Sequence, residues 1–351
     1  MLSSDLGMAK NIAFSCKSLQ VGAVALPNRV ILAPMSGITD APFRRLAERL
    51  GAGLVVSEMT ACAGLAKGER EARLRSDGAG VATHVVQLAG CEARYMAEGA
   101  RIAEALGAAI IDINMGCPSK QVTNGHVGSA LMRDLDHALT LIEATVAAVS
   151  VPVTLKMRLG WDHASINAPE LARRADAAGV KMITVHGRTR CQFYDGRADW
   201  AAIRRVKEAV TVPLVVNGDI ACFDDATQAL AASGADAVMI GRAAQGRPWW
   251  PGQVARFLAT GKRESAPSLP AQLAMTDALY EEMIGHHGHA IGRRHARKHL
   301  AWALDTAAAT AGATLALLKD HRARVLTADE PKLARRLLAD AYDAFAWRAA
   351  A

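Results

Sequence analysis

Apolar residues gather in eight short runs along the first 240 positions, and each run is separated from the next by a segment with apolar residues at helical spacing. Eight β–α units in succession predict an α/β fold, a closed parallel (β/α)8 TIM barrel. An open doubly wound sheet would need a glycine-rich dinucleotide fingerprint after its first strand, and Ala33–Gly37 is not one. The expected strands are Val30–Met35, Leu54–Met59, His84–Leu88, Ile110–Met115, Val151–Met157, Met182–His186, Val212–Asn217 and Ala237–Ile240.

The pattern changes after the eighth run. Residues 260–270 are rich in Pro, Ser and charged residues and predict a linker, while residues 271–351 are rich in Ala and Leu at helical spacing. We therefore expect a barrel over residues 21–259 and a small all-α domain over 271–351. Residues 1–20 mix short apolar pieces with polar ones, lack a signal-peptide core, and are expected to form an N-terminal extension.

Composition narrows the class of protein. The chain has 351 residues, 51% of them hydrophobic, which is enough for a large core. No stretch approaches the roughly 20 apolar residues that span a bilayer. The six cysteines are scattered and never form Cys-x-x-Cys, which argues against a disulfide framework, a zinc ribbon or an iron–sulfur cluster. We expect a soluble, cytoplasmic monomer.

Strand side chains alternate between the barrel interior and the helix layer. In the fourth run this parity places Ile111, Ile113 and Met115 against the helices and turns Asp112 and Asn114 inward. Barrel enzymes place their active sites at the carboxyl ends of the strands, so inward polar groups at those ends predict a site. Six runs each supply one such group: Glu58, Gln87, Asn114, Lys156, His186 and Asn217.

Each of these residues also has a structural interpretation. A single amide in a barrel is more often part of a packed polar layer than a ligand, and Asp112, one layer deeper, is expected to be structural. For His186 a structural and a functional role are equally open. Lys156 differs, because an ammonium among β-branched residues has no local counter-ion and favours a bound anion or an electron-rich ring.

Two late turns indicate a phosphate site. Asn217, Gly218 and Asp219 follow the seventh strand, and Gly241 and Arg242 follow the eighth. Barrels often bind phosphate with backbone N–H groups at this place. Either turn alone is compatible with an ordinary strand-to-helix connection.

Cys117 ends the fourth strand directly before Pro118 and a glycine-rich loop. A free cysteine is most often a small buried hydrophobe. Its place before this proline and loop fits that packing role poorly, and considered alone Cys117 is compatible with a nucleophile or a metal ligand as well as with packing.

The formal net charge of +7 and the isoelectric point near 9.2 favour a polyanionic partner. Residues 286–299 contain no acidic residue, and on a helix Arg293/Arg297 and Arg294/Lys298 fall four positions apart. Such a stripe can bind phosphates, although a solvated helix face is the usual role of a charged run. Five histidines in the same run could bind a metal, but no nearby carboxylate or thiol completes a ligand set, so no metal is expected.

Together these segments closely resemble the flavin-dependent tRNA-dihydrouridine synthases, and most of all the bacterial B-type subfamily. The resemblance runs in order from about Leu26 to Gly252, and the helix containing Arg294–His299 resembles the RNA-binding domain of that family. The matching segments are Ala33–Asp40, Ser57–Met59, Val86–Leu88, Asp112–Pro118, Lys156–Arg158, His186–Arg190, Asn217–Ile220 and Met239–Ala243.

The resemblance implies an FMN cofactor, NADPH or NADH as the reductant, and a tRNA substrate gripped by the helical domain. Cys117 would donate a proton to C5 of a D-loop uridine after hydride reaches C6 from the reduced flavin, and Asn114 would orient the uracil. A thiol with an ordinary pKa of about 8.5 is largely protonated at neutral pH and suits that task. The implied FMN-binding residues are Pro34, Met35, Ser36, Gln87, Lys156, His186, Asn217, Gly218, Asp219, Gly241 and Arg242. The implied substrate-binding residues are Asn114, Arg188, Lys120, Arg293, Arg294, Arg297 and Lys298.

Two alternatives stay open at the level of sequence. A flavin barrel that reduces a free pyrimidine would share Asn114 and Cys117 but would not need residues 271–351. A non-catalytic RNA-binding regulator could keep the fold without its chemistry. The loop after Cys117 also departs from the family, since Gln121 and His126 stand where relatives often carry a more basic residue.

Overall fold

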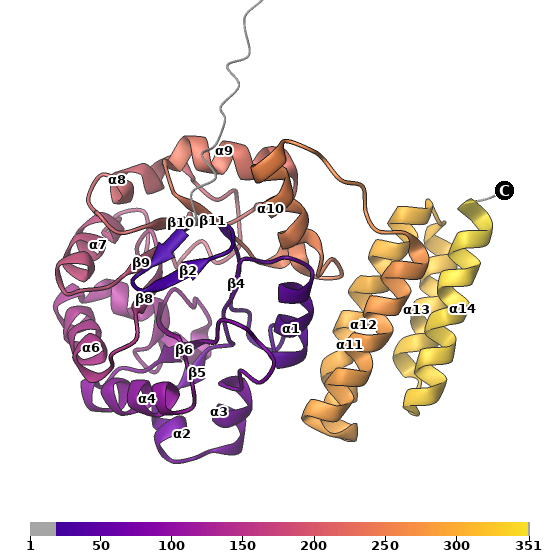
Figure 1. The fold of residues 1–351 in the computed structure, drawn as a ribbon, viewed down its shortest axis with the longest axis horizontal. Helices are drawn as coiled ribbons and strands as arrows, with labels where there is room; N and C mark the ends of the chain where they lie inside the picture. The colour runs from indigo at the N-terminus through magenta and orange to yellow at the C-terminus, as the bar shows by residue number, and fades with distance from the viewer. Residues whose placement is uncertain (1–18, 350–351) are drawn as a thin grey trace, which may run out of the picture.

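The computed structural model describes residues 19–349 and confirms the TIM barrel (Figure 1). Nine parallel strands follow one another in the order β4-β3-β11-β10-β9-β8-β7-β6-β5. A parallel bridge between Val56, just after β4, and Val85 of β6 closes the circle. The strands are β3 (Val30–Leu32), β4 (Leu54–Val55), β5 (Thr60–Ala61), β6 (Val85–Ala89), β7 (Ile110–Met115), β8 (Val153–Arg158), β9 (Met182–His186), β10 (Leu214–Asn217) and β11 (Ala237–Ile240).

The second expected strand, Leu54–Met59, has other bounds in the structure: β4 ends at Val55, and a division at residues 56–59 separates it from β5, which begins at Thr60. The division has a local cause at Ser57, whose side-chain oxygen accepts the backbone N–H of Gln87 at 2.9 Å. A hydroxyl thus replaces a backbone carbonyl in the ladder beside β6, and pairing with β6 resumes at Thr60. Three expected strands, now β7, β9 and β11, have the predicted bounds.

Helices of unequal length surround the strands (Figure 1). The first begins with the Asp40 side chain accepting the N–H of Phe43 and with a proline in the first turn. The α-helices of the barrel are α1 (Ala41–Arg49), α2 (Cys62–Ala66), α3 (Arg70–Arg75), α4 (Ala93–Ala105), α5 (Lys120–Thr123), α6 (Leu135–Ala148), α7 (Ala168–Ala177), α8 (Arg204–Lys207), α9 (Phe223–Ser233) and α10 (Trp250–Thr260). Three 3-10 turns, η1 (Gly128–Arg133), η2 (Ala201–Ile203) and η3 (Arg242–Ala244), complete the loops.

Two separate apolar clusters confirm the predicted strand parity. Ile111, Ile113 and Met115 pack in the large outer cluster between strands and helices. Ile110, from the same strand, belongs to a smaller cluster inside the barrel. Asp112 and Asn114 therefore face the interior, as the parity argument predicted.

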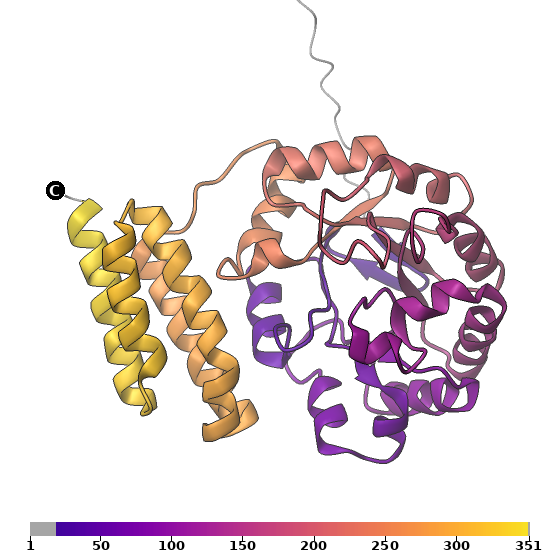
Figure 2. The same ribbon diagram turned by 180° about the vertical axis from the view of Figure 1, so that it is seen from behind.

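A β-hairpin contributes to the barrel interior from its amino-terminal end. β1 (Leu19–Val21) and β2 (Val24–Leu26) pair antiparallel and share the inner cluster with β3, β4 and β6. Gly22, in the turn, packs closely against Pro152, just before β8. In Figure 1 the hairpin lies in front of the barrel, so Figure 2, from behind, shows the end where the strands finish. The hairpin includes positions 19 and 20 of the expected extension, while positions 1–18 lie outside the described residues.

Four helices form a bundle beside α1, separate from the ring of barrel helices in both views (Figures 1 and 2). They are α11 (Leu269–His287), α12 (His289–Ala311), α13 (Leu315–Thr327) and α14 (Pro331–Ala349). Glu282 of α11 binds Arg45 and Arg49 of α1, with N–O distances of 3.0 and 2.9 Å. None of the helices in residues 19–349 combines the length and apolarity needed to cross a membrane.

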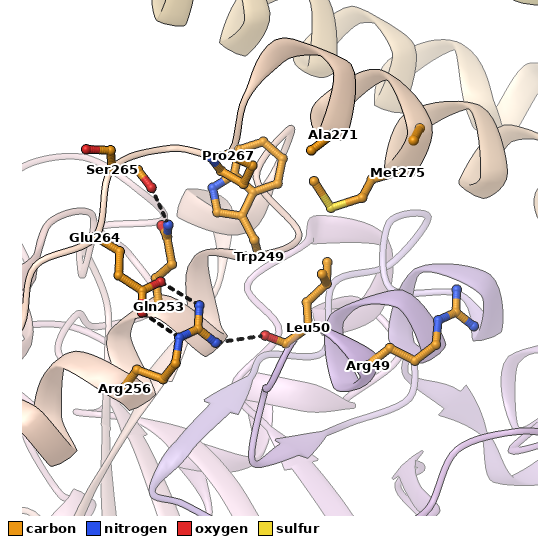
Figure 3. Close-up of a pocket in the computed structure, with 11 residues that line it drawn as sticks. Arg49, Leu50, Trp249, Gln253, Arg256, Glu264, Ser265, Pro267, Ala271 and Met275 are labelled. Atoms are coloured by element: carbon orange, nitrogen blue, oxygen red, sulfur yellow. Dashed lines mark hydrogen bonds and ion pairs between the residues drawn. The ribbon is translucent and has the colours of Figure 1, made fainter.

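The connection between barrel and bundle, residues 261–268, has neither helix nor strand but is held at several points. Gln253 donates to the carbonyl of Ser265 at 2.7 Å, and Arg256 pairs with Glu264 at 2.7 Å (Figure 3). A hollow of about 630 Å³ lies between this segment, α10 and α11. It reaches Leu50 at the end of α1, so it opens away from the carboxyl ends of the strands.

Candidate active site

A chain of hydrogen bonds crosses the interior from β6 to β8. The Asn114 amide donates to the Gln87 side-chain oxygen at 2.7 Å, and Gln87 donates to Asp112 at 2.7 Å. Thr154 donates to the other carboxylate oxygen of Asp112 at 2.6 Å. The strand register places these residues side by side, with Gln87 opposite Asp112 and Asp112 opposite Thr154. Asp112 thus anchors the layer beneath the site, the structural role expected for it.

Asn114 also fixes the backbone that carries the thiol. Its side-chain oxygen accepts the N–H groups of Gly116 and Cys117, at 3.1 and 3.0 Å. The Cys117 carbonyl accepts the Ser129 hydroxyl at 2.7 Å, which brings the loop after the strand back over it. Gly128 makes this approach possible, since it has a φ of +65° and lies against Cys117. The free, partly exposed thiol of Cys117 is therefore held at the end of β7 by both flanks.

A buried arginine supports the same loop. Arg158, at the end of β8, is only 1% exposed. Its guanidinium donates to the carbonyls of Gly116, Thr189 and Phe193 at 2.8–2.9 Å. Three carbonyls from two loops thus converge on one side chain. Arg158 joins the cysteine loop after β7 to the loop after β9.

Lys156 projects from β8 next to Asn114 in the strand register. No hydrogen bond or ion pair joins its ammonium to another residue in the described part of the chain. Burial, together with the nearby charge of Arg158, lowers the pKa of Lys156 to about 8, while Asp112 and Cys117 act in the opposite direction. An inward ammonium without a protein partner is a binding group for an anion or an electron-rich atom.

We call the end of the barrel where the strands finish its mouth. On the other side of the mouth from Lys156, Arg188 is 1% exposed and uses all five of its N–H donors. It binds both carboxylate oxygens of Asp219, at 3.1 and 2.5 Å, and the carbonyls of Asp195 and Gly196. Its fifth contact is with Nε2 of His186 at 3.3 Å. All five donors are thus directed to protein acceptors, and Arg188 positions Asp219 and His186. The expected contact of Arg188 with the substrate stays a prediction.

The Arg188 contact also defines the state of His186. A guanidinium can only donate, so Nε2 of His186 accepts and the ring proton lies on Nδ1. Burial, followed by the charges of Arg158, Lys156, Arg188 and Arg242, lowers the pKa of His186 well below its ordinary value. His186 is thus neutral and offers an Nδ1–H donor.

The two predicted phosphate turns lie next to each other. Asp219 bridges Arg188 and Arg242, the latter at 3.1 Å, and the side chain of Arg242 is about half exposed. Two guanidinium charges against one carboxylate leave a net positive charge at this edge. Asn217 below them donates to the Met239 carbonyl at 2.8 Å, and Gly241 lies against Met35 of the first loop. The structure thus brings together the turns after β10 and β11 and the Pro34–Ser36 segment.

A further contact joins the mouth to the helical bundle. Glu58 is 4% exposed, accepts the N–H of Gly37, and has its pKa raised by burial. The ammonium of Lys298, from α12, lies so near Gly37 that an added Cβ there would be 2.9 Å from it. Lys298 therefore points at the first loop of the barrel.

The predicted basic stripe divides into two faces. Arg293 and Arg297 both lie near Asp329, with N–O distances of 3.1 and 3.5 Å. Arg294 is exposed and has no hydrogen bond or ion pair to another residue of the described chain, and Lys120, at the start of α5, is exposed as well. Arg294 and Lys120 are thus accessible to a partner, whereas Arg293 and Arg297 are partly engaged.

Sequence reasoning gave no role to Arg158, Thr154, Ser129 or Tyr194. Strand parity could have found Thr154 and Arg158, which lie two positions on either side of Lys156. Tyr194 is 51% exposed and its ring lies 4.8 Å from the Arg242 guanidinium and 5.7 Å from that of Arg158. The loop that carries Tyr194 has no strand or helix periodicity, so no sequence pattern predicts that this residue lies at the site.

Comparison with known proteins agrees with this geometry. The family described as Dihydrouridine synthase (Dus) matches residues 31–334. A "Probable tRNA-dihydrouridine synthase" of Rhizobium leguminosarum bv. phaseoli is 53% identical over 321 residues, 92% of this chain and 97% of the relative. A "tRNA-dihydrouridine synthase B" of Xanthomonas axonopodis pv. citri is 46% identical over 327 residues, 93% and 96% of the two chains.

Solved structures share the fold at low identity. Histamine dehydrogenase from Rhizobium sp. 4-9 superposes with a TM-score of 0.55 at 15% identity, covering 77% of this chain and 51% of that one. Morphinone reductase in complex with tetrahydroNAD gives 0.50 at 16% identity, covering 73% and 93%. The family match extends over most of the chain, through both the barrel and most of the bundle. The chain belongs to the dihydrouridine synthase family.

Proposed function

We propose that the protein reduces a uridine of tRNA to dihydrouridine, with a D-loop uridine as the target, FMN as the cofactor and NADPH as the reductant. The observation that carries the proposal is the thiol of Cys117, held by Asn114 at the barrel mouth beside the unpartnered ammonium of Lys156. The family membership supplies the reaction.

The residues at the mouth fit an anionic flavin mononucleotide. Arg188 and Arg242 outweigh Asp219 in charge, so the turns after β10 and β11 suit its phosphate. Lys156 suits the electron-rich pyrimidine edge of the ring, and His186 presents an Nδ1–H donor between the two. Pro34, Met35 and Ser36 would line the face next to Gly241, and Gln87 and Asn217 would form the polar layer below. When bound, the reduced flavin supplies the hydride for C6 of the uracil, and NADPH restores it.

The chain's own residues complete the addition. Addition of hydride at C6 leaves negative charge on C5 and on the C4 carbonyl. C5 then needs a proton. Cys117 donates it, so two electrons and two hydrogens saturate the C5=C6 bond. Asn114, whose side chain fixes the cysteine backbone, holds the thiol against the base. General acid catalysis of this kind contributes about 10²–10⁴-fold to a rate.

The helical bundle supplies the grip on tRNA in this proposal. A uridine in folded tRNA must leave its stack to reach a barrel mouth, so contacts outside the barrel are needed. Arg294 of the bundle is exposed for phosphate contact, as is Lys120 in the barrel loop after β7, and Lys298 of the bundle reaches the first loop of the barrel.

The test is Cys117→Ala, assayed on tRNA from a strain that lacks this protein. We expect dihydrouridine formation to fall about 10²–10⁴-fold, while flavin absorbance and tRNA affinity stay unchanged. Cys222→Ala, which removes an exposed cysteine far along the chain, is the matched control and should be fully active. Normal turnover by the Cys117 variant would remove it as the acid, and a colourless wild-type protein would contradict the flavin.

A further inference from the structure

Three ligand-type side chains meet where α1 of the barrel contacts α11 and α12 of the bundle. They are Asp40, before α1, His287, at the end of α11, and His295, on α12. One oxygen or nitrogen atom from each lies within 4.8 Å of the corresponding atoms of the other two. The positions of Asp40 and His287 are separated by 247 residues, so folding alone creates the group.

The group is shielded from solvent and partly preorganised. Asp40 is 3% exposed and His287 is 8% exposed. Oδ1 of Asp40 accepts the N–H of Phe43 at 3.1 Å, which fixes the carboxylate and turns Oδ2 toward Nε2 of His287, 2.8 Å away. An outer hydrogen bond that orients a ligating carboxylate is a usual feature of metal sites.

His295 completes the third side. Its ring centroid is 4.6 Å from that of His287, and its Nδ1 atom is buried without a hydrogen-bond partner in the described chain. A plain Asp–His hydrogen bond would explain the Asp40–His287 pair but not a second imidazole directed into the same place.

The distances suit a small divalent ion. Nitrogen and oxygen ligands lie about 2.0–2.1 Å from zinc in tetrahedral sites, so ligand atoms are about 3.4 Å apart. A group within 4.8 Å reaches that spacing by small rotations of the rings. Two imidazoles and one carboxylate leave a fourth position for water.

The neighbouring charged residues do not occupy the carboxylate of Asp40, which stays available to a cation. Arg44, a buried cation that feels the charge of Asp40, donates to the carbonyls of Thr39 and Asp77 rather than to Asp40. His286, packed edge-on against His287, lies 3.6 Å from Asp77. Lys298 and Arg294 lie on the side of His295 and oppose a cation, which limits the affinity without occupying a ligand.

We infer that Asp40, His287 and His295 form a binding site for one Zn²⁺-class divalent ion, which fastens the helical bundle to the barrel. The expectation of no metal rested on the lack of a carboxylate near the histidine run, and Asp40 supplies that carboxylate from another domain. The inference is independent of the proposed reaction, since none of the three residues belongs to the catalytic group.

The experiment measures metal binding by the full-length protein, treated with chelator and dialysed into metal-free buffer. Zn²⁺ is titrated against a colorimetric competitor, and Co²⁺ serves as a spectroscopic probe. We expect one Zn²⁺ per chain, a visible Co²⁺ spectrum without thiolate charge transfer, and a rise of Tm with Zn²⁺. His295→Gln should weaken the affinity by about 100-fold or more and abolish the rise of Tm.

His289→Gln is the matched control, because His289 is exposed on the same histidine-rich run. It should bind Zn²⁺ like the wild type. Equal affinity in the wild type and His295→Gln would overturn the site, as would a thiolate band in the Co²⁺ spectrum or a failure of the wild type to take Zn²⁺ from the competitor. Because His295 makes no hydrogen bond in the described chain, its variant should fold. His295→Ala provides a second test: it should also lose Zn²⁺ affinity, while an unchanged flavin content shows that it has folded.

Discussion

On the β9–β11 side of the barrel mouth, every donor of Arg188 is used and Asp219 is bound by two arginines. On the β7–β8 side, Lys156 has an inward ammonium with no partner among the described residues, and its pKa is lowered to about 8, chiefly by burial. The buried cation Arg188 is therefore fully paired within the protein on one side, whereas Lys156 is left without a partner on the other.

This difference separates two tasks. A buried ion pair with all its hydrogen bonds made is a rigid part of the site, but it has few free donors for a ligand. An unpartnered charge destabilises the free protein and is compensated only when a ligand binds. We therefore expect changes on the Arg188 side to affect stability first, and changes at Lys156 to affect binding first.

Arg188→Met should have the largest effect. It leaves the partly buried Asp219 with fewer donors and leaves three further acceptors, the carbonyls of Asp195 and Gly196 and Nε2 of His186, facing an apolar side chain. The free energy of unfolding should therefore fall by about 3–5 kcal/mol. Urea denaturation followed by circular dichroism measures this loss.

Arg242→Met is the control on the same carboxylate. The side chain of Arg242 is about half exposed, so its loss should cost less than about 1 kcal/mol of stability while weakening flavin binding. Similar stability losses in the two variants would show that the hydrogen bonds of Arg188 do not stabilise the protein more than the exposed pair of Arg242 does.

Lys156→Met should show the reverse pattern. Removing an unpaired charge from the interior should leave the stability of the flavin-free protein unchanged or raise it. The loss of a charged hydrogen bond to the flavin, about 1.5–3 kcal/mol, should weaken flavin affinity by about 10–150-fold. Fluorescence titration of flavin-free protein with FMN gives that affinity.

Lys120→Met removes an exposed lysine from the neighbouring loop and is the matched control. It should leave FMN affinity unchanged. If both lysine variants bind FMN like the wild type, the ammonium of Lys156 serves another purpose.

Strand parity explains why the inward strand-end residues of the mouth could be predicted from sequence. Asn114 and Lys156 are inward residues at strand ends, and the period of two places both of them without knowledge of loops. The same period also predicted that Ile113 faces the helices, which the outer cluster confirms.

The contacts of Arg188 and the Asp40–His287 pair depend on loops and on distant parts of the chain. The acceptors that bind Arg188 include Asp195 and Gly196, in a loop without regular structure, and no sequence period places such carbonyls. The Asp40–His287 pair joins two domains, so inspection of the histidine run alone could not find its carboxylate. The contacts that sequence could not predict are thus those whose partners lie outside the repeating strands.

The smallest expected effect is a pH dependence in which loss of the proton on Lys156 changes flavin affinity and protein stability in opposite directions. Above pH 8 the side chain of flavin-free protein loses its proton, so FMN affinity should fall by about tenfold between pH 8 and pH 9.5. Stability should change in the opposite direction. The folded pKa of Lys156 lies below the ordinary value of 10.5, so the unfolded chain binds more protons between pH 8 and 10.5, and the contribution of this group to the unfolding free energy rises with pH there.

Other groups titrate in the same range, so the quantity to measure is the difference between the wild type and Lys156→Met at each pH. That difference should show FMN affinity decreasing and unfolding free energy increasing from pH 8 to pH 10. If both differences are flat, Lys156 keeps its proton throughout, which would mean that an acidic partner within the protein neutralises it as Asp219 neutralises Arg188. The contrast between the two sides of the mouth would then disappear, because both would consist of paired charges.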